Sequence, residues 1–297
     1  MEQQLSPTRP HPFFDKHTIL GTVVIILWAY CIVMFTAAFP ITIICMFLGL
    51  GDPTDYLFLG IIVTAPLTLL IHRLWFIPDF KGILFRGFLK TLRCCPVILL
   101  FWLALCLPDF LHGDFPQTFN LKVISLSLTA GFSEEVIFRG LPLSYLKRQL
   151  RSEKQVPLIV IITGAIFGLT HLTNVFVGAS VSASLLQGVT TTCIGIFFGA
   201  VFMRGGNILV PMLLHTLHDA LLLSFMEADE VSAVLEEEAS LNDIPTVLIC
   251  AALAAFGFFL IRRSKRREIC DMWAETWSQT TENLPENPAE PETLQEV

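Results

Sequence analysis

Long apolar segments, each close to the length that crosses a bilayer, alternate with short polar loops along most of the chain. About 20 apolar residues span the hydrocarbon core as a helix. The first segment is too long for one straight span and contains Pro40, so we expect one tilted, bent helix there. The pattern predicts an all-α, polytopic bundle of about eight transmembrane helices, at residues 18–49, 55–74, 90–108, 121–146, 156–175, 182–203, 207–226 and 244–263.

The charges of the loops predict the orientation of these helices. The loops 50–56, 109–120, 174–181 and 227–243 contain no Lys or Arg. Nearly all of the 19 basic residues lie in the remaining loops and in the two terminal segments. Because Lys and Arg concentrate in cytoplasmic loops, we expect an integral, multi-pass membrane protein with both termini in the cytoplasm. That arrangement requires an even number of spans.

Composition agrees with a membrane protein. Of the 297 residues, 54% are hydrophobic and only 15% are charged, whereas a soluble domain carries roughly 25% charge. The eight cysteines form no CxxC pair and no metal-ligand spacing, which argues against a disulfide framework or a zinc–cysteine site. We expect membrane lipids and a polypeptide as partners, and no nucleic acid.

The pattern divides the chain into six parts. They are a cytoplasmic N-terminal segment (1–17), N-terminal transmembrane helices (18–120), a helical core (121–226), an acidic outer loop (227–243), the last transmembrane helix (244–263) and a cytoplasmic tail (264–297) that is first basic and then acidic. The tail places Ile269, Trp273 and Trp277 four residues apart, a stripe that we expect in the plane of the membrane interface. Its Pro- and acid-rich end predicts disorder.

Three polar clusters interrupt the apolar segments of the core. They are Glu134-Glu135-x-x-x-Arg139, Phe167-x-x-x-His171 and His215-x-x-x-Asp219. Ionisable groups are costly inside a bilayer, and those that occur there commonly serve function. Two carboxylates, two histidines and a further acid at membrane depth therefore predict a reaction centre within the membrane.

The first cluster predicts one ion pair and one spare carboxylate. Glu135 and Arg139 are four residues apart on a helix, so they can pair. Glu134 is rotated about 100° from Glu135 and can point elsewhere. A spare desolvated carboxylate near a histidine is suited to act as a general base. The alternative is that both acids only fix helix packing.

The other two clusters place histidines on helix faces. Phe167 and His171 share one face, and His171 alone would equally fit a hydrogen bond between helices. His215 and Asp219 share another face and can bind one metal or act together on one substrate oxygen. The alternative role of Asp219 is to orient His215, as carboxylates beside metal ligands do. We interpret the neighbouring His218 as a contact between helices.

The ordered set EExxxR, FxxxH and HxxxD on successive apolar helices resembles the CPBP family of CAAX-processing and bacteriocin-processing intramembrane proteases, also called the abortive-infection family. The resemblance covers roughly residues 121–226, which would then form the catalytic core. It implies that Glu134 and His171 activate a water for attack on a peptide carbonyl, that His215 and Asp219 stabilise the oxyanion, and that Arg139 holds Glu135. Family members commonly carry Asn where this chain has Asp219.

The resemblance leaves the cofactor and the substrate open. Either no cofactor is needed, or one divalent metal, most plausibly zinc, binds His171, His215 and one carboxylate. We expect an intramembrane endopeptidase, a metalloprotease or a glutamate-dependent enzyme, that acts on a membrane-anchored or leader-bearing polypeptide. Two alternatives are a non-catalytic bacteriocin-immunity or membrane interaction protein on the same scaffold and a proton-coupled transporter. The absence of an internal repeat argues against the transporter.

Overall fold

The computed structural model describes residues 17–61, 66, 67, 70, 87–116, 120–143, 152–225 and 238–278. Every regular element in these ranges is a helix, so the all-α prediction is confirmed for them. Half of the expected second span (55–74), most of the acidic outer loop (227–243) and the end of the tail lie outside the described residues.

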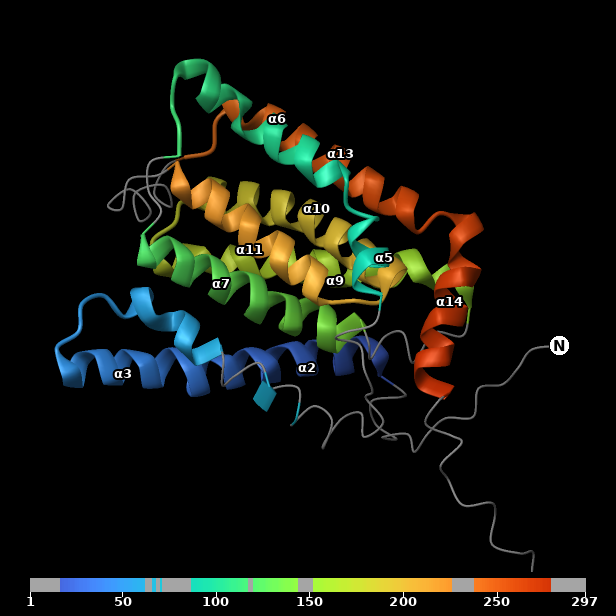
Figure 1. Cartoon of the computed structure of the whole chain (residues 1–297), viewed down its shortest axis with the longest axis horizontal. Helices are drawn as coiled ribbons and strands as arrows, with labels where there is room; N and C mark the ends of the chain where they lie inside the picture. The colour runs from blue at the N-terminus through green and yellow to red at the C-terminus, as the bar shows by residue number, and fades with distance from the viewer. Residues whose placement is uncertain are drawn as a thin grey trace, which may run out of the picture.

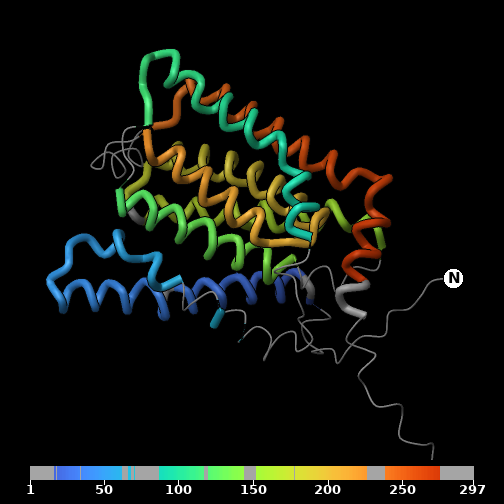
Figure 2. Tube along the Cα trace, in the orientation of Figure 1, coloured from blue at the N-terminus to red at the C-terminus, as the bar shows by residue number. Residues whose placement is uncertain are grey.

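The helices form a layered bundle (Figures 1 and 2). Helices α7 (Leu121–Glu135), α9 (Val156–His171), α10 (Val181–Gly205) and α11 (Leu209–Ser224) form its centre. Helices α2 (Thr18–Val33) and α3 (Phe39–Leu48) lie on one side, and α6 (Val97–His112) and α13 (Ile244–Leu260) lie on the other. The short α5 (Phe88–Leu92) and the last helix α14 (Arg263–Ser278) lie at one end of the bundle.

Short helices complete the description. They are 3-10 turns at Pro53–Tyr56, Glu153–Gln155, Leu172–Val177 and Leu241–Asp243, and π-helical turns at Met34–Ala38 and Val136–Gly140. The first π-turn joins α2 to α3 directly before Pro40, whose missing N–H cannot continue the regular hydrogen-bond ladder. The second extends α7 and contains Arg139, in line with the frequent occurrence of π-turns at functional sites.

Four helical stretches are long and apolar enough to cross a membrane: Ile19–Leu48, Glu153–Phe176, Val181–Gly205 and Leu241–Leu260. Helices α6 and α11 are apolar but shorter. Among the residues that the structure describes, the number of long spans is therefore smaller than the eight that hydropathy predicts. Large apolar side chains such as Phe35, Met46 and Phe47 are exposed on the outside of the bundle, which suits a surface in contact with lipid.

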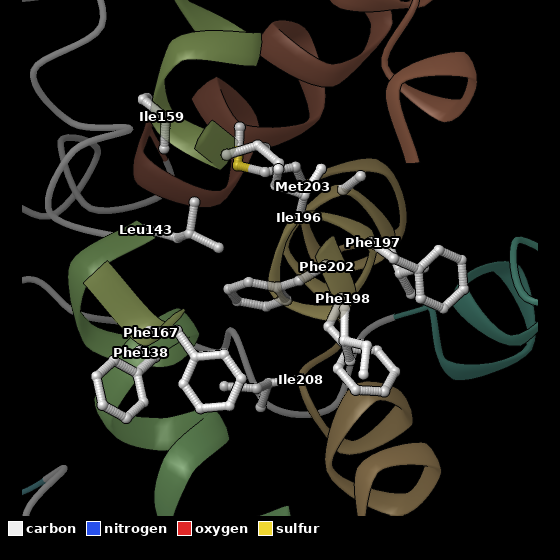
Figure 3. Packing of buried hydrophobic residues seen from close by; sticks show 14 of the residues in the cluster. Phe138, Leu143, Ile159, Phe167, Ile196, Phe197, Phe198, Phe202, Met203 and Ile208 are labelled. Atoms are coloured by element: carbon white, nitrogen blue, oxygen red, sulfur yellow. The ribbon is translucent and has the colours of Figure 1, made fainter. Parts of the chain in front are cut away.

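The buried core contains many aromatic side chains. Phe167, Phe197, Phe198 and Phe202 are almost completely inaccessible, and Figure 3 shows Phe138 beside Phe167 within this core. The core cluster joins α9, α10, α11 and α13 with the π-turn after α7. The polar clusters predicted from the sequence are thus set among rigidly packed aromatic rings.

The aromatic stripe of the tail is not placed as the sequence predicts. Ile269 is 0% exposed and Trp273 is 2% exposed, because both pack against the ends of the core helices. The Trp273 indole N–H donates to the Met203 carbonyl oxygen (2.9 Å). The expectation that these two side chains face the membrane interface is therefore wrong, since hydropathy alone does not distinguish lipid from protein as the apolar partner. The side chain of Trp277 lies outside what is described.

Glycine allows α9 and α10 to approach closely. A Cβ atom at Gly168 would overlap the Thr192 side chain and the Gly188 carbonyl oxygen. We expect Gly168→Ala to lower the free energy of unfolding by about 1–3 kcal/mol or more, because the helices would have to separate. Gly199→Ala is the matched control on α10, since its Cβ would lie 3.5 Å from Val160 in ordinary contact. Denaturant unfolding in mild detergent measures both; equal stabilities would contradict the close-packing account.

Candidate active site

His215 lies where the first and third clusters meet. Its Nδ1 atom is 2.9 Å from Glu135 Oε1. Its Nε2 atom is 3.8 Å from Glu134 Oε2 and 3.6 Å from Asp219 Oδ2. The end of α7 and the middle of α11 therefore bring three carboxylates around one imidazole. The sequence predicted the pairing of His215 with Asp219 but not its contact with Glu135, which is 80 positions away in the chain.

Glu135 holds two partners with one oxygen. The Arg139 guanidinium donates from Nη1 to Glu135 Oε1 (2.8 Å), as the four-residue spacing predicts. Because an ionised carboxylate only accepts hydrogen bonds, His215 donates to the same oxygen from Nδ1. The side chains of Glu135 and Arg139 are both 0% exposed. Glu135 thus fixes both the ring orientation of His215 and the position of a buried positive charge.

Exposure separates the carboxylates into two kinds. The Glu134 side chain is 32% exposed and that of Asp219 is 24% exposed, in contrast to the fully buried Glu135. Only the first two can therefore meet a substrate or a water molecule from outside. His215 Nε2 faces this accessible side, while its Nδ1 faces the buried ion pair.

The ring of Phe167 connects all three clusters. The Arg139 guanidinium lies 4.2 Å from the ring centroid, in the geometry of a cation–π contact. The rings of His171 and His215 meet Phe167 edge-on, at centroid distances of 4.8 Å and 6.0 Å. A fully buried Phe thus sets the separation of the two histidines. The sequence placed Phe167 and His171 on one face but did not indicate this role, which depends on contacts across three helices.

His171 lies at the C-terminal end of α9. Its Nδ1 atom is 2.9 Å from the Phe167 carbonyl oxygen, so Nδ1 carries the proton and Nε2 is left as an acceptor when the ring is neutral. Among the described residues we find no hydrogen bond or ion pair between His171 and an acidic side chain. The shared action of Glu134 and His171 on one water remains a prediction.

His218 is a contact between helices, as predicted. Its buried ring lies 5.6 Å from the Phe101 ring of α6, centroid to centroid. Its partner in this contact is an apolar ring, and the histidine that contacts Glu134 and Glu135 is His215 instead. We therefore assign His218 to packing.

The side chains of the three clusters include the expected ligands of a metal ion. The expected set was His171, His215 and one carboxylate. Among the described residues, no group of three or more His, Cys, Asp or Glu side chains is arranged to hold a metal ion. The residues as placed do not fit a resident metal, and no step below is assigned to one.

Phe167 offers a test of how the clusters are held together. We expect Phe167→Leu to lower kcat by roughly ten- to a hundredfold with little change in KM, because the site would remain open but its histidines and Arg139 would shift. The matched control is Phe202→Leu, which removes an equally buried ring that contacts Trp273 instead. Steady-state kinetics of both variants, with their melting temperatures, measures the difference. Equal losses of kcat would mean that the Phe167 ring acts only through general packing.

Comparison with known proteins supports one family. Residues 116–221 match the family model described as type II CAAX prenyl endopeptidase Rce1-like. No curated protein and no solved structure matches significantly. The matched segment contains all three clusters, so the resemblance to the CPBP intramembrane proteases is confirmed over it. Together with the long apolar helices, the match indicates an integral membrane protein that is similar to proteases.

Proposed function

We propose that the protein is an intramembrane endopeptidase that hydrolyses a peptide bond of a membrane-anchored or membrane-adjacent polypeptide. The observation that carries this proposal is the meeting of three carboxylates, from Glu134, Glu135 and Asp219, around the His215 imidazole. The His171 ring is linked to the same imidazole through the ring of Phe167. A packing role would need only the buried ion pair. It would leave two partly exposed carboxylates at the same imidazole without a purpose.

Glu134 is the proposed general base. It is partly exposed, and the buried ion pair of Arg139 is with Glu135 rather than with Glu134. Its oxygen would take a proton from a water molecule as the water oxygen bonds to the scissile carbonyl carbon. The same proton would then pass to the leaving nitrogen as the peptide bond breaks. His171 would orient the water through its free Nε2 atom.

His215 is the proposed donor to the oxyanion that forms in this step. Its Nδ1 atom already donates to Glu135, so Nε2 can donate toward the substrate only when the ring carries both protons, a form that the three carboxylates around it stabilise by charge. Asp219, 3.6 Å from Nε2, would keep the ring in this orientation. An aligned donor of this kind contributes on the order of 2.7–4 kcal/mol to an acyl-transfer transition state. Glu135 and Arg139 would act through His215 rather than on the substrate.

The proposed substrate is tested with anchored peptides. The name of the matched family suggests a C-terminal CAAX peptide with a prenyl group on its cysteine. Purified chain in proteoliposomes would be given this peptide, the same peptide without the prenyl group, and a peptide anchored by an apolar leader helix. Cleavage of at least one anchored peptide, and its loss with Glu134→Gln, would support the proposal. Failure to cleave any of them would refute it for these two substrate classes.

We expect hydrolysis to survive removal of metals. The donor set does not form a three-ligand site, and the proposed steps need only a carboxylate and imidazole groups. Activity after dialysis against a strong chelator should stay within about twofold of that of the untreated enzyme. Loss of an essential catalytic group would lower it by roughly 10²-fold or more, so the two outcomes are easily distinguished. A loss that added zinc restores would contradict this expectation and would require a rearranged His171 and His215.

A further inference from the structure

Helix α14 lies at the same end of the bundle as α5 (Figure 1). Its position is set by contacts with the protein. Trp273 donates to the Met203 carbonyl and packs edge-on against Phe202, with the ring centroids 5.2 Å apart. Ile269, one turn earlier, is fully buried. These contacts fix which face of α14 turns outward.

The single acid in the first half of α14 is already neutralised. Glu268 forms ion pairs with Arg204 at 2.8 Å, with Lys265 at 3.4 Å and with Lys90 of α5 at 3.9 Å. Hydrogen bonding to Arg204 is the main reason that the pKa of Glu268 lies below its ordinary value. Glu268 therefore shares its charge among three basic residues, and none of its ion pairs involves Arg263 or Arg267.

The outward face carries arginines without acidic partners. Arg263 and Arg267 are exposed and four residues apart, so they form one stripe. Neither makes an ion pair with an acidic side chain of the described segments. Arg267 also lines a cleft of about 460 Å³ between α5 and α14, together with Lys90, Glu268, Asp271 and Met272. The cleft thus has basic groups from two helices at its edge.

Arg262 shows that this surface lies at the level of the membrane boundary. Its guanidinium is 4.2 Å from the ring centroid of Phe259, and it donates to the Phe259 carbonyl oxygen (3.0 Å). Phe259 is 53% exposed near the end of the membrane-length helix Leu241–Leu260. An exposed Phe ring near the end of a membrane-length helix suits the edge of the hydrocarbon region, and Arg side chains near helix ends extend from there to the headgroups. The adjacent arginines are then at headgroup depth.

We propose that Arg262, Arg263 and Arg267, with Lys90 across the cleft, bind the phosphate headgroup of an anionic phospholipid. Guanidinium groups match phosphate oxygens in a bidentate manner and are always charged. A lipid, rather than free phosphate, is the expected ligand because Arg262 lies along a lipid-facing ring. We call these four residues the headgroup patch. This proposal is independent of the proposed hydrolysis.

The test measures lipid preference in the full chain. Purified protein in neutral detergent would be titrated with phosphatidylglycerol or phosphatidylcholine and followed by native mass spectrometry. The double variant R263Q/R267Q should bind phosphatidylglycerol about tenfold to thirtyfold more weakly, since each basic residue near an anionic surface contributes about a factor of five. R263K/R267K should keep much of the preference. Inorganic phosphate, added at equal concentration, should not displace the lipid.

The control removes the same charge from the same end of the molecule. Arg93 and Lys154 are exposed basic residues outside the headgroup patch. R93Q/K154Q should bind phosphatidylglycerol like the original protein. An equal loss in both double variants would show that only total charge matters and would overturn the proposal. Displacement by inorganic phosphate would instead assign the patch to a soluble anion, and equal affinity for both lipids would also refute it.

Discussion

Glu134→Gln is expected to lower kcat by roughly 10²–10⁴-fold, the range in which a positioned general base contributes. The amide has nearly the shape of the carboxylate but cannot accept the proton of the attacking water. Folding should change little, because the Glu134 side chain is 32% exposed and its contact with His215 Nε2 is as long as 3.8 Å. KM should therefore stay close to that of the original protein.

The measurement is steady-state hydrolysis in proteoliposomes, with the melting temperature of each variant recorded in parallel. Glu153→Gln is the matched control, since it makes the same chemical change at an exposed position in the turn before α9. Full activity of Glu134→Gln would remove the proposed base. A parallel fall in melting temperature and activity would instead assign Glu134 to the fold.

Removing Glu135 should have the largest effect on stability. Glu135→Ala leaves Arg139 buried without its partner and frees the His215 ring, since both bond to the same oxygen. Breaking one side of a buried ion pair typically costs about 3–5 kcal/mol in the free energy of unfolding. We expect this loss together with the loss of hydrolysis. Denaturant unfolding in mild detergent gives the first quantity.

A double variant separates folding from chemistry at this position. E135L/R139M replaces both charges with apolar side chains and should recover most of the lost stability, because no buried charge remains unpaired. It should stay inactive, since His215 Nδ1 still lacks its acceptor. The exposed pair Lys122–Asp52 is the control: Lys122→Gln should cost no more than about 1 kcal/mol. Recovery of activity in E135L/R139M would contradict the role of Glu135 in orienting His215.

Contacts within one helix could be predicted from the sequence. The Glu135–Arg139 pair follows from helical spacing alone, and so does the approach of Asp219 to His215. The contact between His215 and Glu135 could not, because it depends on how α7 packs against α11. The same holds for Phe167, whose ring contacts side chains from other helices at angles that periodicity does not encode.

Hydropathy predicted the helical class better than the number of spans. It measures apolar composition, whereas the length of a helix depends on local breaks such as Pro96 and Gly113 at the two ends of α6. It also could not place Trp273, since a buried protein contact and a membrane interface favour the same side chain. The second difference arises because lipid and protein are equivalent apolar partners in a one-dimensional pattern.

The most direct test of the central claim compares protein termini in host membranes that carry either the original chain or Glu134→Ala. If the protein is an endopeptidase that depends on Glu134, new termini should appear only with the original chain, and their sequences would identify the substrate. Identical termini, with both proteins present at equal levels and folded, would contradict the claim. The three clusters would then belong to the scaffold of a non-catalytic interaction protein.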